Sequence, residues 1–168
     1  MRVLITGGTG LIGQALCRKL TEYGAQVTVL SRQPERVPEL CANARGIATL
    51  QEITSADAVI NLAGAPIADR PWTKARRALL WQSRVDATHA LITWIQQLKQ
   101  RPSVLVSASA TGWYGDCEGR IVNENSAQQS EDFASRLCDA WEKLWVGDIS
   151  KKKIMLKRVN IYGLHLIV

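Results

Sequence analysis

The 168-residue sequence predicts an α/β protein built on a doubly wound parallel sheet, with helices on both faces. Three observations support this fold class. Short apolar runs alternate with longer segments of helical periodicity along the chain. A glycine-rich turn, TGGTGLIG at residues 6–13, directly follows the first apolar run. The length and the 46% hydrophobic content suit a single domain over residues 1–168.

The first half of the chain alternates strand and helix patterns. The run Arg2–Thr6 is expected to be a buried strand, and Leu11–Tyr23 a helix whose apolar residues share one face. Gly24 follows at the place of a helix C-cap glycine. Further strands are expected at Gln26–Leu30, Gly46–Leu50 and Ala56–Leu62, with a short helix at Pro34–Leu40.

The second half continues the alternation. A long helix is expected from Thr73, as its N-cap, to about Gln100, because Pro102 prevents its continuation. Since strands and helices keep alternating, the sheet should be parallel and covered on both faces. The remaining elements are a strand at Ser103–Ser107, a helix at Glu131–Val146 and a strand at Ile154–Ile161.

Composition restricts the classes of partner. The net charge is +6, but the basic residues are scattered except near the C-terminus, and no aromatic residues alternate with them. We therefore expect no nucleic-acid partner, with binding through the basic C-terminal end as the open alternative. No apolar stretch is long enough to cross a bilayer, which favours a cytoplasmic protein without membrane contact. The four cysteines form no C-x-x-C pair, so no metal site is expected.

The glycine-rich turn has the chemistry of an anion site. A strand, a glycine turn and a helix start present backbone N–H groups and the positive end of a helix dipole to a diphosphate. Gly7 allows the tight turn, Gly10 leaves room for the ligand, and Gly13 lets the helix lie close. This is a Rossmann-type nucleotide-binding arrangement, and an ordinary glycine-rich turn is the other interpretation. The predicted cofactor contacts here are Gly7, Thr9, Gly10, Leu11, Ile12 and Gly13.

The end of the second strand indicates which dinucleotide is bound. An acidic residue there would accept hydrogen bonds from the ribose hydroxyls of NAD. This chain has Ser31 and Arg32 instead. Because a guanidinium matches a 2′-phosphate, the sequence predicts NADP(H) rather than NAD(H).

Four stretches resemble the extended, epimerase-like branch of the short-chain dehydrogenase/reductase superfamily. They are TGGTGLIG at 6–13, NLAG at 61–64, SRVDATHALI at 83–92 and SASATGWYGD at 107–116. The resemblance implies that Asn61, Leu62, Ala63 and Gly64 lie beside the adenosine half of the cofactor. It also adds Arg84 to the cofactor contacts, at a position where the branch usually has asparagine.

A narrower resemblance comes from INLAGAPIADRPWT and from RLCDAWE at 136–142. These segments look like the atypical YfcH-like group of NAD(P)-dependent epimerases, similar to the human epimerase family protein numbered 39U. The group brings no established substrate, and a small carbonyl compound or a sugar nucleotide is the substrate class expected if the chain is active. Its members are about twice as long, so we expect the C-terminal substrate-binding part to be missing here.

The superfamily's catalytic pattern is incomplete in this chain. In that pattern a serine, a tyrosine and a lysine act as acid–base groups, with the last two spaced Y-x-x-x-K. Ser109, just after the expected fifth strand, matches the serine, and Ser107 is a weaker candidate. No Y-x-x-x-K occurs, and Asp132 and Arg136 stand at the two positions. Tyr114 is the alternative proton donor, but the tyrosine at this position of the extended branch mostly shapes the pocket, so the resemblance favours a packing role over proton transfer.

Two functions therefore remain open from the sequence. One is an NADP(H)-dependent oxidoreductase or epimerase in which Ser109 and Tyr114 are catalytic and Arg136 holds ribose hydroxyls of the cofactor. The other is a non-catalytic nicotinamide-dinucleotide-binding module, such as a redox sensor or a truncated remnant. The extended branch also implies a possible homodimer through the two long helices, at about 73–100 and 131–146.

Overall fold

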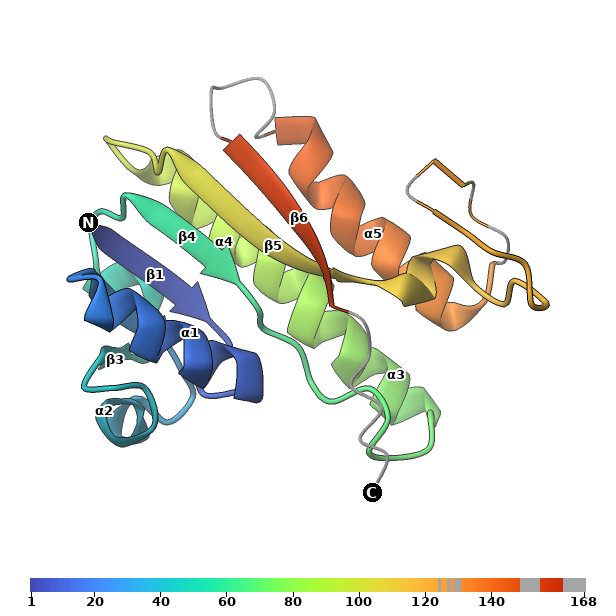
Figure 1. The fold of residues 1–168 in the computed structure, drawn as a ribbon, viewed down its shortest axis with the longest axis horizontal. Coiled ribbons are helices and arrows are strands. Elements are labelled where there is room, and N and C mark those ends of the chain that lie inside the picture. Colours follow the sequence, from blue (N-terminus) through green and yellow to red (C-terminus); the bar gives the residue numbers. More distant parts are fainter. Residues whose placement is uncertain (124, 127, 129–130, 149–154, 162–168) are drawn as a thin grey trace.

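The computed structural model describes residues 1–123, 125–126, 128, 131–148 and 155–161 (Figure 1). In this part of the chain, six parallel strands form one sheet in the order β3-β2-β1-β4-β5-β6. The strands are β1 (Arg2–Thr6), β2 (Gln26–Leu30), β3 (Arg45–Ile47), β4 (Ala58–Asn61), β5 (Val104–Ala110) and β6 (Met155–Ile161).

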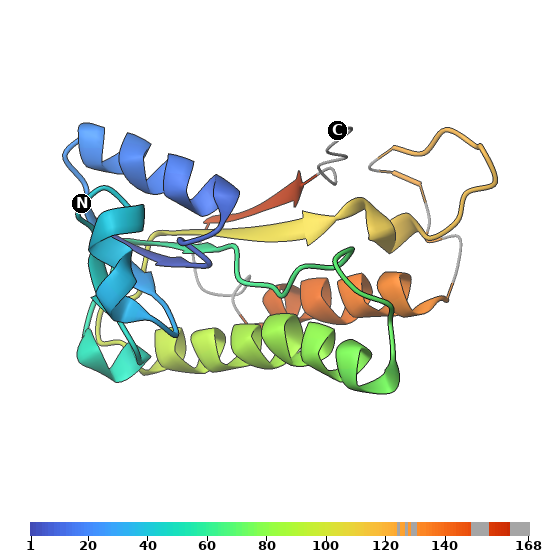
Figure 2. The ribbon, with the colours of Figure 1, turned by 90° about the horizontal axis from the view of Figure 1, so that it is seen from below.

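The helices between the strands are α1 (Leu11–Glu22), α2 (Val37–Leu40), α3 (Lys74–Trp81), α4 (Ala87–Gln97) and α5 (Phe133–Asp148). A π-helical turn at Gln82–Asp86 joins α3 to α4, and short 3-10 turns lie at Pro34–Arg36, Leu50–Glu52 and Thr111–Tyr114. Figure 2 shows α1 on one face of the sheet and α3, α4 and α5 on the other. The doubly wound α/β prediction is confirmed.

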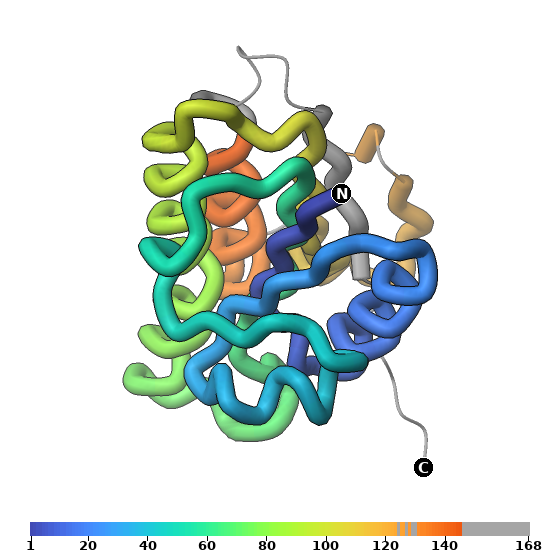
Figure 3. The backbone as a smooth tube through the Cα atoms, turned by 90° about the vertical axis from the view of Figure 1, so that its left-hand side faces the viewer, coloured from blue at the N-terminus to red at the C-terminus, as the bar shows by residue number. Residues whose placement is uncertain are grey.

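Alternating side chains of the strands build a separate core on each face. On β1, Val3 and Ile5 join the cluster that contains Cys17 of α1 and Val37 of α2. Leu4, between them, packs into the cluster on the opposite face, with residues of α4 and with Trp145 of α5. The same two layers of helices flank the sheet in the end-on view of Figure 3. Burial on both faces explains why the strands are continuous apolar runs.

The caps predicted for two helices are confirmed. Gly24 has φ of +74° directly after the last turn of α1, a conformation that glycine adopts without strain. The Thr73 hydroxyl accepts a hydrogen bond from the Arg76 backbone N–H at 3.2 Å, as an N-cap should.

Several predicted boundaries are wrong. The third strand is Arg45–Ile47 and not Gly46–Leu50, because residues 50–52 turn into a 3-10 segment. The fourth strand is shorter than predicted, and α5 begins at Phe133. The long helix ends at Gln97 and is interrupted by the π turn. The fifth strand extends to Ala110, so Ser109 lies inside it and not after it.

No helix in the described ranges has the length and apolar character needed to span a membrane. Cys17, Cys41, Cys117 and Cys138 are all present as free thiols. Burial raises the pKa of Cys17 to about 12, so its thiol is protonated at neutral pH.

Candidate functional site

The predicted site residues gather along the carboxyl edge of the sheet. Ser31 follows β2, the glycine turn follows β1, and Leu62 follows β4, while Ser109 lies near the end of β5. These four strands are consecutive neighbours in the sheet. Strands lie about 4.8 Å apart, so the residues extend over roughly 14 Å along one edge. Ligands of open α/β sheets bind at this edge.

The glycine turn is packed too closely for side chains. Gly7 has φ of +72°, and a Cβ on it would lie 2.6 Å from the Leu62 carbonyl oxygen. A Cβ on Gly13 would lie 2.4 Å from the Gly7 carbonyl oxygen. Gly7 therefore brings the turn against the end of β4, and Gly13 lets α1 start directly behind the turn.

The first turn of α1 is open to an anion. Gly10 is the N-cap, no side chain caps the helix, and a Cβ on Gly10 would approach only the Gly7 carbonyl oxygen, at 3.3 Å. Next to the free N–H groups, Leu11 is 68% exposed and Ile12 is 40% exposed. The backbone N–H groups of this turn suit the diphosphate of a dinucleotide, and Gly10 leaves room for it. The exposed apolar side chains next to them offer a surface that the ligand would cover.

The residues after β2 suit a 2′-phosphate. The Ser31 N–H donates to the Ile47 carbonyl at 2.9 Å, and its hydroxyl accepts from the Gln33 N–H at 3.1 Å. These bonds fix the backbone turn that carries Arg32. Arg32 is exposed, and no ion pair involves it among the described residues. Its guanidinium is therefore available at the surface beside the glycine turn.

Asn61 anchors a buried polar network below the edge. Its carboxamide accepts from the Thr6 hydroxyl at 2.5 Å and donates to the Thr88 hydroxyl at 2.9 Å. Thr6 also accepts from the Ala63 N–H at 3.2 Å, and Thr88 accepts from Trp141 Nε1 at 2.9 Å. The Asn61 side chain is thus turned into the protein, and it holds the 62–64 backbone in place. Thr6 and Thr88 stand in the motifs TGGTGLIG and SRVDATHALI, but sequence reasoning assigned neither of them a role in the site.

The π turn presents two adjacent side chains to one residue of the β4–α3 connection. The Ser83 hydroxyl accepts from the Ala65 N–H at 3.0 Å, and Arg84 Nη2 donates to the Ala65 carbonyl at 3.0 Å. The guanidinium lies so close to Gly64 that a Cβ there would be 2.9 Å from Arg84 Cζ. Burial lowers the pKa of Arg84. Arg84 therefore supports the loop expected to face the cofactor.

Ser109 is paired with a carboxylate that the sequence did not reveal. Its hydroxyl donates to Glu142 Oε1, and Ser109 is only 3% exposed. Burial, with a smaller contribution from the Glu142 charge, raises the pKa of nearby Cys138 to about 11. The pair joins β5 to the middle of α5. Glu142 was missed because its partner lies 33 residues away in the sequence.

The other predicted catalytic-region residues lie in the turn after β5 and at the start of α5. Tyr114, in the 3-10 turn after β5, packs edge-on against Trp113 with ring centroids 5.1 Å apart. The Asp132 carboxylate accepts from the Ser135 N–H at 2.9 Å and so caps the start of α5. Arg136 is exposed on α5. Asp132 and Arg136 thus stand where the Y-x-x-x-K pattern has its tyrosine and lysine.

Comparison with known proteins agrees with this geometry. The sequence model described as "NAD dependent epimerase/dehydratase family" matches residues 3–142. An epimerase family protein of Bacillus subtilis, YfhF, is 37% identical over 148 residues, which is 85% of this chain and 48% of the relative. The chloroplastic SDR39U1 homologue of Arabidopsis thaliana is 30% identical over 171 residues, 96% of this chain and 49% of the relative.

Solved structures share the architecture. The human epimerase family protein SDR39U1 with NADPH has a TM-score of 0.73 and 32% identity, over 86% of this chain and 48% of that one. A UDP-galactose 4-epimerase has a TM-score of 0.78 at 22% identity, over 95% of this chain and 55% of that one, which shows the common fold. The chain spans about half the length of the curated relatives it matches.

Proposed function

This chain belongs to the NAD dependent epimerase/dehydratase family, and from that premise we propose that it binds NADP(H) along the carboxyl edge of its sheet. The observation that carries the proposal is the uncapped first turn of α1 behind Gly7, Gly10 and Gly13. Backbone N–H groups there would hold the diphosphate. Leu11 and Ile12 would be covered by the ligand, and Thr9 would border it.

The choice of NADP(H) rests on charge. Arg32 is exposed at the end of β2, where the ribose of the adenosine half would lie, and Ser31 offers a hydroxyl beside it. A guanidinium gains charge-assisted hydrogen bonds from a 2′-phosphate that a 2′-hydroxyl cannot provide. The relative SDR39U1 was solved with NADPH, which supports the same choice.

The remaining cofactor contacts follow the order of the strands. The 62–64 backbone, held from below by Asn61 and from the side by Arg84, would line the middle of the cofactor. We propose Arg136 as a contact to ribose hydroxyls, given its place on α5. When bound, the nicotinamide donates or accepts a hydride. The substrate class we propose is a small carbonyl compound or a sugar nucleotide.

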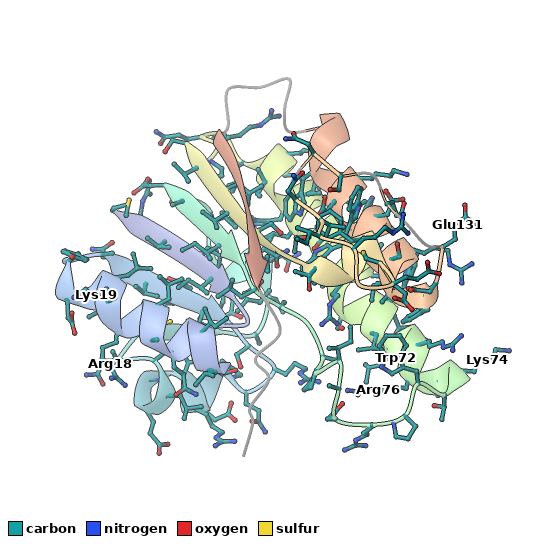
Figure 4. The ribbon with its side chains drawn as sticks, turned by 45° about the vertical axis from the view of Figure 1, so that its right-hand side comes forward. Arg18, Lys19, Trp72, Lys74, Arg76 and Glu131 are labelled. Atoms are coloured by element: carbon teal, nitrogen blue, oxygen red, sulfur yellow. The ribbon has the colours of Figure 1, made fainter. Side chains whose placement is uncertain are left out.

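A titration with both cofactors tests the proposal. The chain should bind NADPH more tightly than NADH, measured by the fluorescence of the reduced nicotinamide. Arg32→Ala should weaken NADPH binding by roughly 10- to 100-fold, the value of one or two charge-assisted hydrogen bonds, and should leave NADH binding unchanged. Arg18→Ala, an exposed arginine on α1 labelled in Figure 4, is the matched control and should change neither affinity.

Equal losses of NADPH and NADH affinity in Arg32→Ala would refute the 2′-phosphate assignment. Failure of the parent chain to bind either cofactor would refute the proposed function as a whole.

A specific observation favours the non-catalytic alternative. Ser109 is buried, and its proton is directed at Glu142, so the hydroxyl is not presented to a substrate carbonyl in this structure. With Asp132 used as a helix cap, Tyr114 is the remaining candidate for proton transfer. Retained NADPH affinity without turnover would indicate a binding module. Turnover that disappears in Tyr114→Phe would indicate an enzyme.

A further inference from the structure

A polar pocket lies at the amino edge of the sheet, at the opposite end of the strands from the proposed cofactor site. It has a volume of about 400 Å³ and is partly open to solvent. This end of the sheet faces the viewer in Figure 3, where N marks the start of β1. We call it the amino-edge pocket, and its polar lining includes Arg2, Gln26, Thr28, Arg45, Glu52 and Thr54.

The pocket exists because the connection from β3 to β4 is short. Residues 48–57, all within the described part of the chain, contain the 3-10 turn Leu50–Glu52 and no helix. The starts of β2 and β3 are therefore not covered by a helix of this connection. Ile53 lines the pocket and also packs against the core cluster, so it forms the boundary between the two.

The sheet face under the pocket changes from apolar to polar along each strand. Side chains two positions apart on a strand share a face. On the α4 side, the core contains side chains from β1, β2 and β3, namely Leu4, Leu30 and Ile47. Two positions earlier on these strands, the same face carries the polar residues Arg2, Thr28 and Arg45. The floor of the pocket is thus a polar extension of the core face.

Several donors and acceptors on this floor are unused. Thr28 and Arg45 are register partners, so their backbones lie about 4.8 Å apart on neighbouring strands. Within the described ranges, the side chains of Gln26, Thr28 and Thr54 make no hydrogen bond. Arg45 Nη2 donates to the Glu52 carbonyl at 3.4 Å, which is longer than the usual distance of about 2.7–3.2 Å. These groups are available to a ligand.

Arg45 supplies the positive charge that no carboxylate neutralises. Arg2 is paired with Asp57, with Nη2 2.6 Å from Oδ1. Glu52 Oε1 accepts two backbone N–H groups at 2.8 and 2.9 Å, as part of a capping box. No ion pair joins Arg45 to a carboxylate among the residues that the structure describes. A guanidinium in this state binds an oxyanion through parallel hydrogen bonds.

We propose that the amino-edge pocket binds a small hydroxylated oxyanion, such as a phosphorylated polyol. Arg45 holds the oxyanion, while Thr28 and Gln26 form hydrogen bonds with the hydroxyl groups. Small-molecule sites have volumes of about 300–1,000 Å³, so the pocket has room for more than an inorganic phosphate. Its amide and hydroxyl groups favour a polar ligand over an apolar one. The site goes beyond the proposed function and does not depend on it.

An NMR titration of the ¹⁵N-labelled chain tests the proposal. Glycerol 3-phosphate is the probe, and inorganic phosphate and glycerol are its fragments, each added at constant ionic strength with and without saturating NADPH. The Arg45 Nε–Hε signal and the Gln26 side-chain amide signals should shift and saturate with glycerol 3-phosphate. Inorganic phosphate should bind about tenfold more weakly, because it lacks the hydroxyl groups, and glycerol should not saturate.

Variants identify the residues responsible. Arg45→Gln should weaken glycerol 3-phosphate at least about tenfold, as expected for the loss of a charge-assisted pair. Thr28→Val should weaken it about three- to tenfold and leave inorganic phosphate unchanged, because only a hydroxyl contact is lost. Arg18→Gln, an exposed arginine on α1 (Figure 4), is the matched control and should bind like the parent. If a variant does not fold, the titration of the parent chain still decides.

Signals that do not shift, or that shift without saturation, would overturn the proposal. So would equal affinities for glycerol 3-phosphate and inorganic phosphate, because the hydroxyl groups would then play no part. Displacement by NADPH would also overturn it, since the probe would then lie at the cofactor edge. If the chain binds no NADPH but the probe still saturates Arg45, the proposed function fails and the amino-edge pocket stands.

Discussion

At the scale of single residues, the glycine turn shows which features of the site can be anticipated. Gly7 and Gly13 were assigned their roles from spacing alone, and the backbone contacts that exclude a Cβ agree with those roles. Glu142 could not be anticipated, since a carboxylate on a helix is ordinarily solvated. Its contact with Ser109 depends on how α5 packs on β5. The geometry of the glycine turn can therefore be predicted from the adjacent residues. A side-chain contact between two elements, such as Ser109 with Glu142, cannot.

Gly13→Ala should destabilise the fold, contrary to the usual effect of alanine in a helix. Glycine is normally about 1 kcal/mol worse than alanine inside a helix, so an open site would gain stability. Here the Cβ would lie 2.4 Å from the Gly7 carbonyl oxygen and 2.5 Å from Gly8 Cα. Overpacking of this kind costs about 1–3 kcal/mol, which urea denaturation measures.

Gly24→Ala is the matched control on the same helix. Its Cβ would meet nothing within 4 Å, but φ is +74°, so the cost is the strain of a left-handed alanine, about 1 kcal/mol. NADPH affinity should fall in Gly13→Ala and stay constant in Gly24→Ala. A stabilised Gly13→Ala variant would contradict the close packing of the turn.

Asp57 should contribute stability that is lost in acid. Hydrogen bonds from the Arg2 side chain, and then from its backbone N–H, lower the pKa of Asp57 from 3.8 to about 2. Because the folded pKa lies below the unfolded one, the contribution is fully present above the ordinary pKa and disappears as pH falls toward the folded value. Asp57→Asn should therefore be less stable than the parent at pH 6, measured by urea denaturation.

The difference between the parent and Asp57→Asn should close between about pH 4 and pH 2. A difference that is the same at both ends of this range would show that Asp57 acts through something other than its charge.

At the scale of elements, the sequence predicted the six strands and most helices, but it treated α3, the π turn and α4 as one continuous helix. The apolar periodicity runs through residues 82–86, and nothing local distinguishes them from an ordinary helix. The turn coincides with the two hydrogen bonds that Ser83 and Arg84 make to Ala65. π turns inside helices occur frequently at functional sites, and this one carries the two side chains that hold the β4–α3 connection.

The polar network below the edge should be the main connection between β4, α4 and α5. Thr88→Val keeps the shape of the side chain but leaves Trp141 Nε1 without its acceptor, and it leaves Asn61 Nδ2 with only the Ser107 hydroxyl as acceptor, at 3.4 Å. Buried donors without partners cost about 1–3 kcal/mol each, so the free energy of unfolding should fall by about 2–3 kcal/mol.

Thr93→Val provides the comparison, because Thr93 is exposed on the same helix and donates only to the His89 carbonyl. Its effect should stay within about 0.5 kcal/mol. Equal effects of the two substitutions would mean that the network contributes no more than an exposed hydroxyl does.

At the scale of the whole molecule, the fold class was predictable because alternation of strands and helices allows few solutions. The strand order β3-β2-β1-β4-β5-β6 then places the residues after β2, β1 and β4 in sequence along one edge. The motifs after these three strands, which are separate in the sequence, therefore lie next to one another along the proposed cofactor edge. The same topology places α3, α4 and α5 together on one face, away from α1 (Figure 2).

That helical face is where we propose a homodimer. On α4, the exposed residues Ala87, Ala90 and Thr93 recur every three positions and form a stripe of small side chains. A second copy could approach closely along such a stripe, although small residues bury little apolar area, so the association should depend on concentration. Sedimentation velocity over a range of concentrations should show monomer and dimer in exchange.

Ala90→Arg should shift this equilibrium to the monomer, because an arginine on each copy would place bulk and like charge in the contact. Arg18→Ala, on the opposite face of the sheet, should sediment like the parent. NADPH affinity should be the same in all three proteins, because neither Ala90 nor Arg18 is among the proposed cofactor contacts. A parent chain that sediments as a monomer at every concentration would contradict the dimer. An Ala90→Arg variant that still dimerises would show that the contact lies elsewhere.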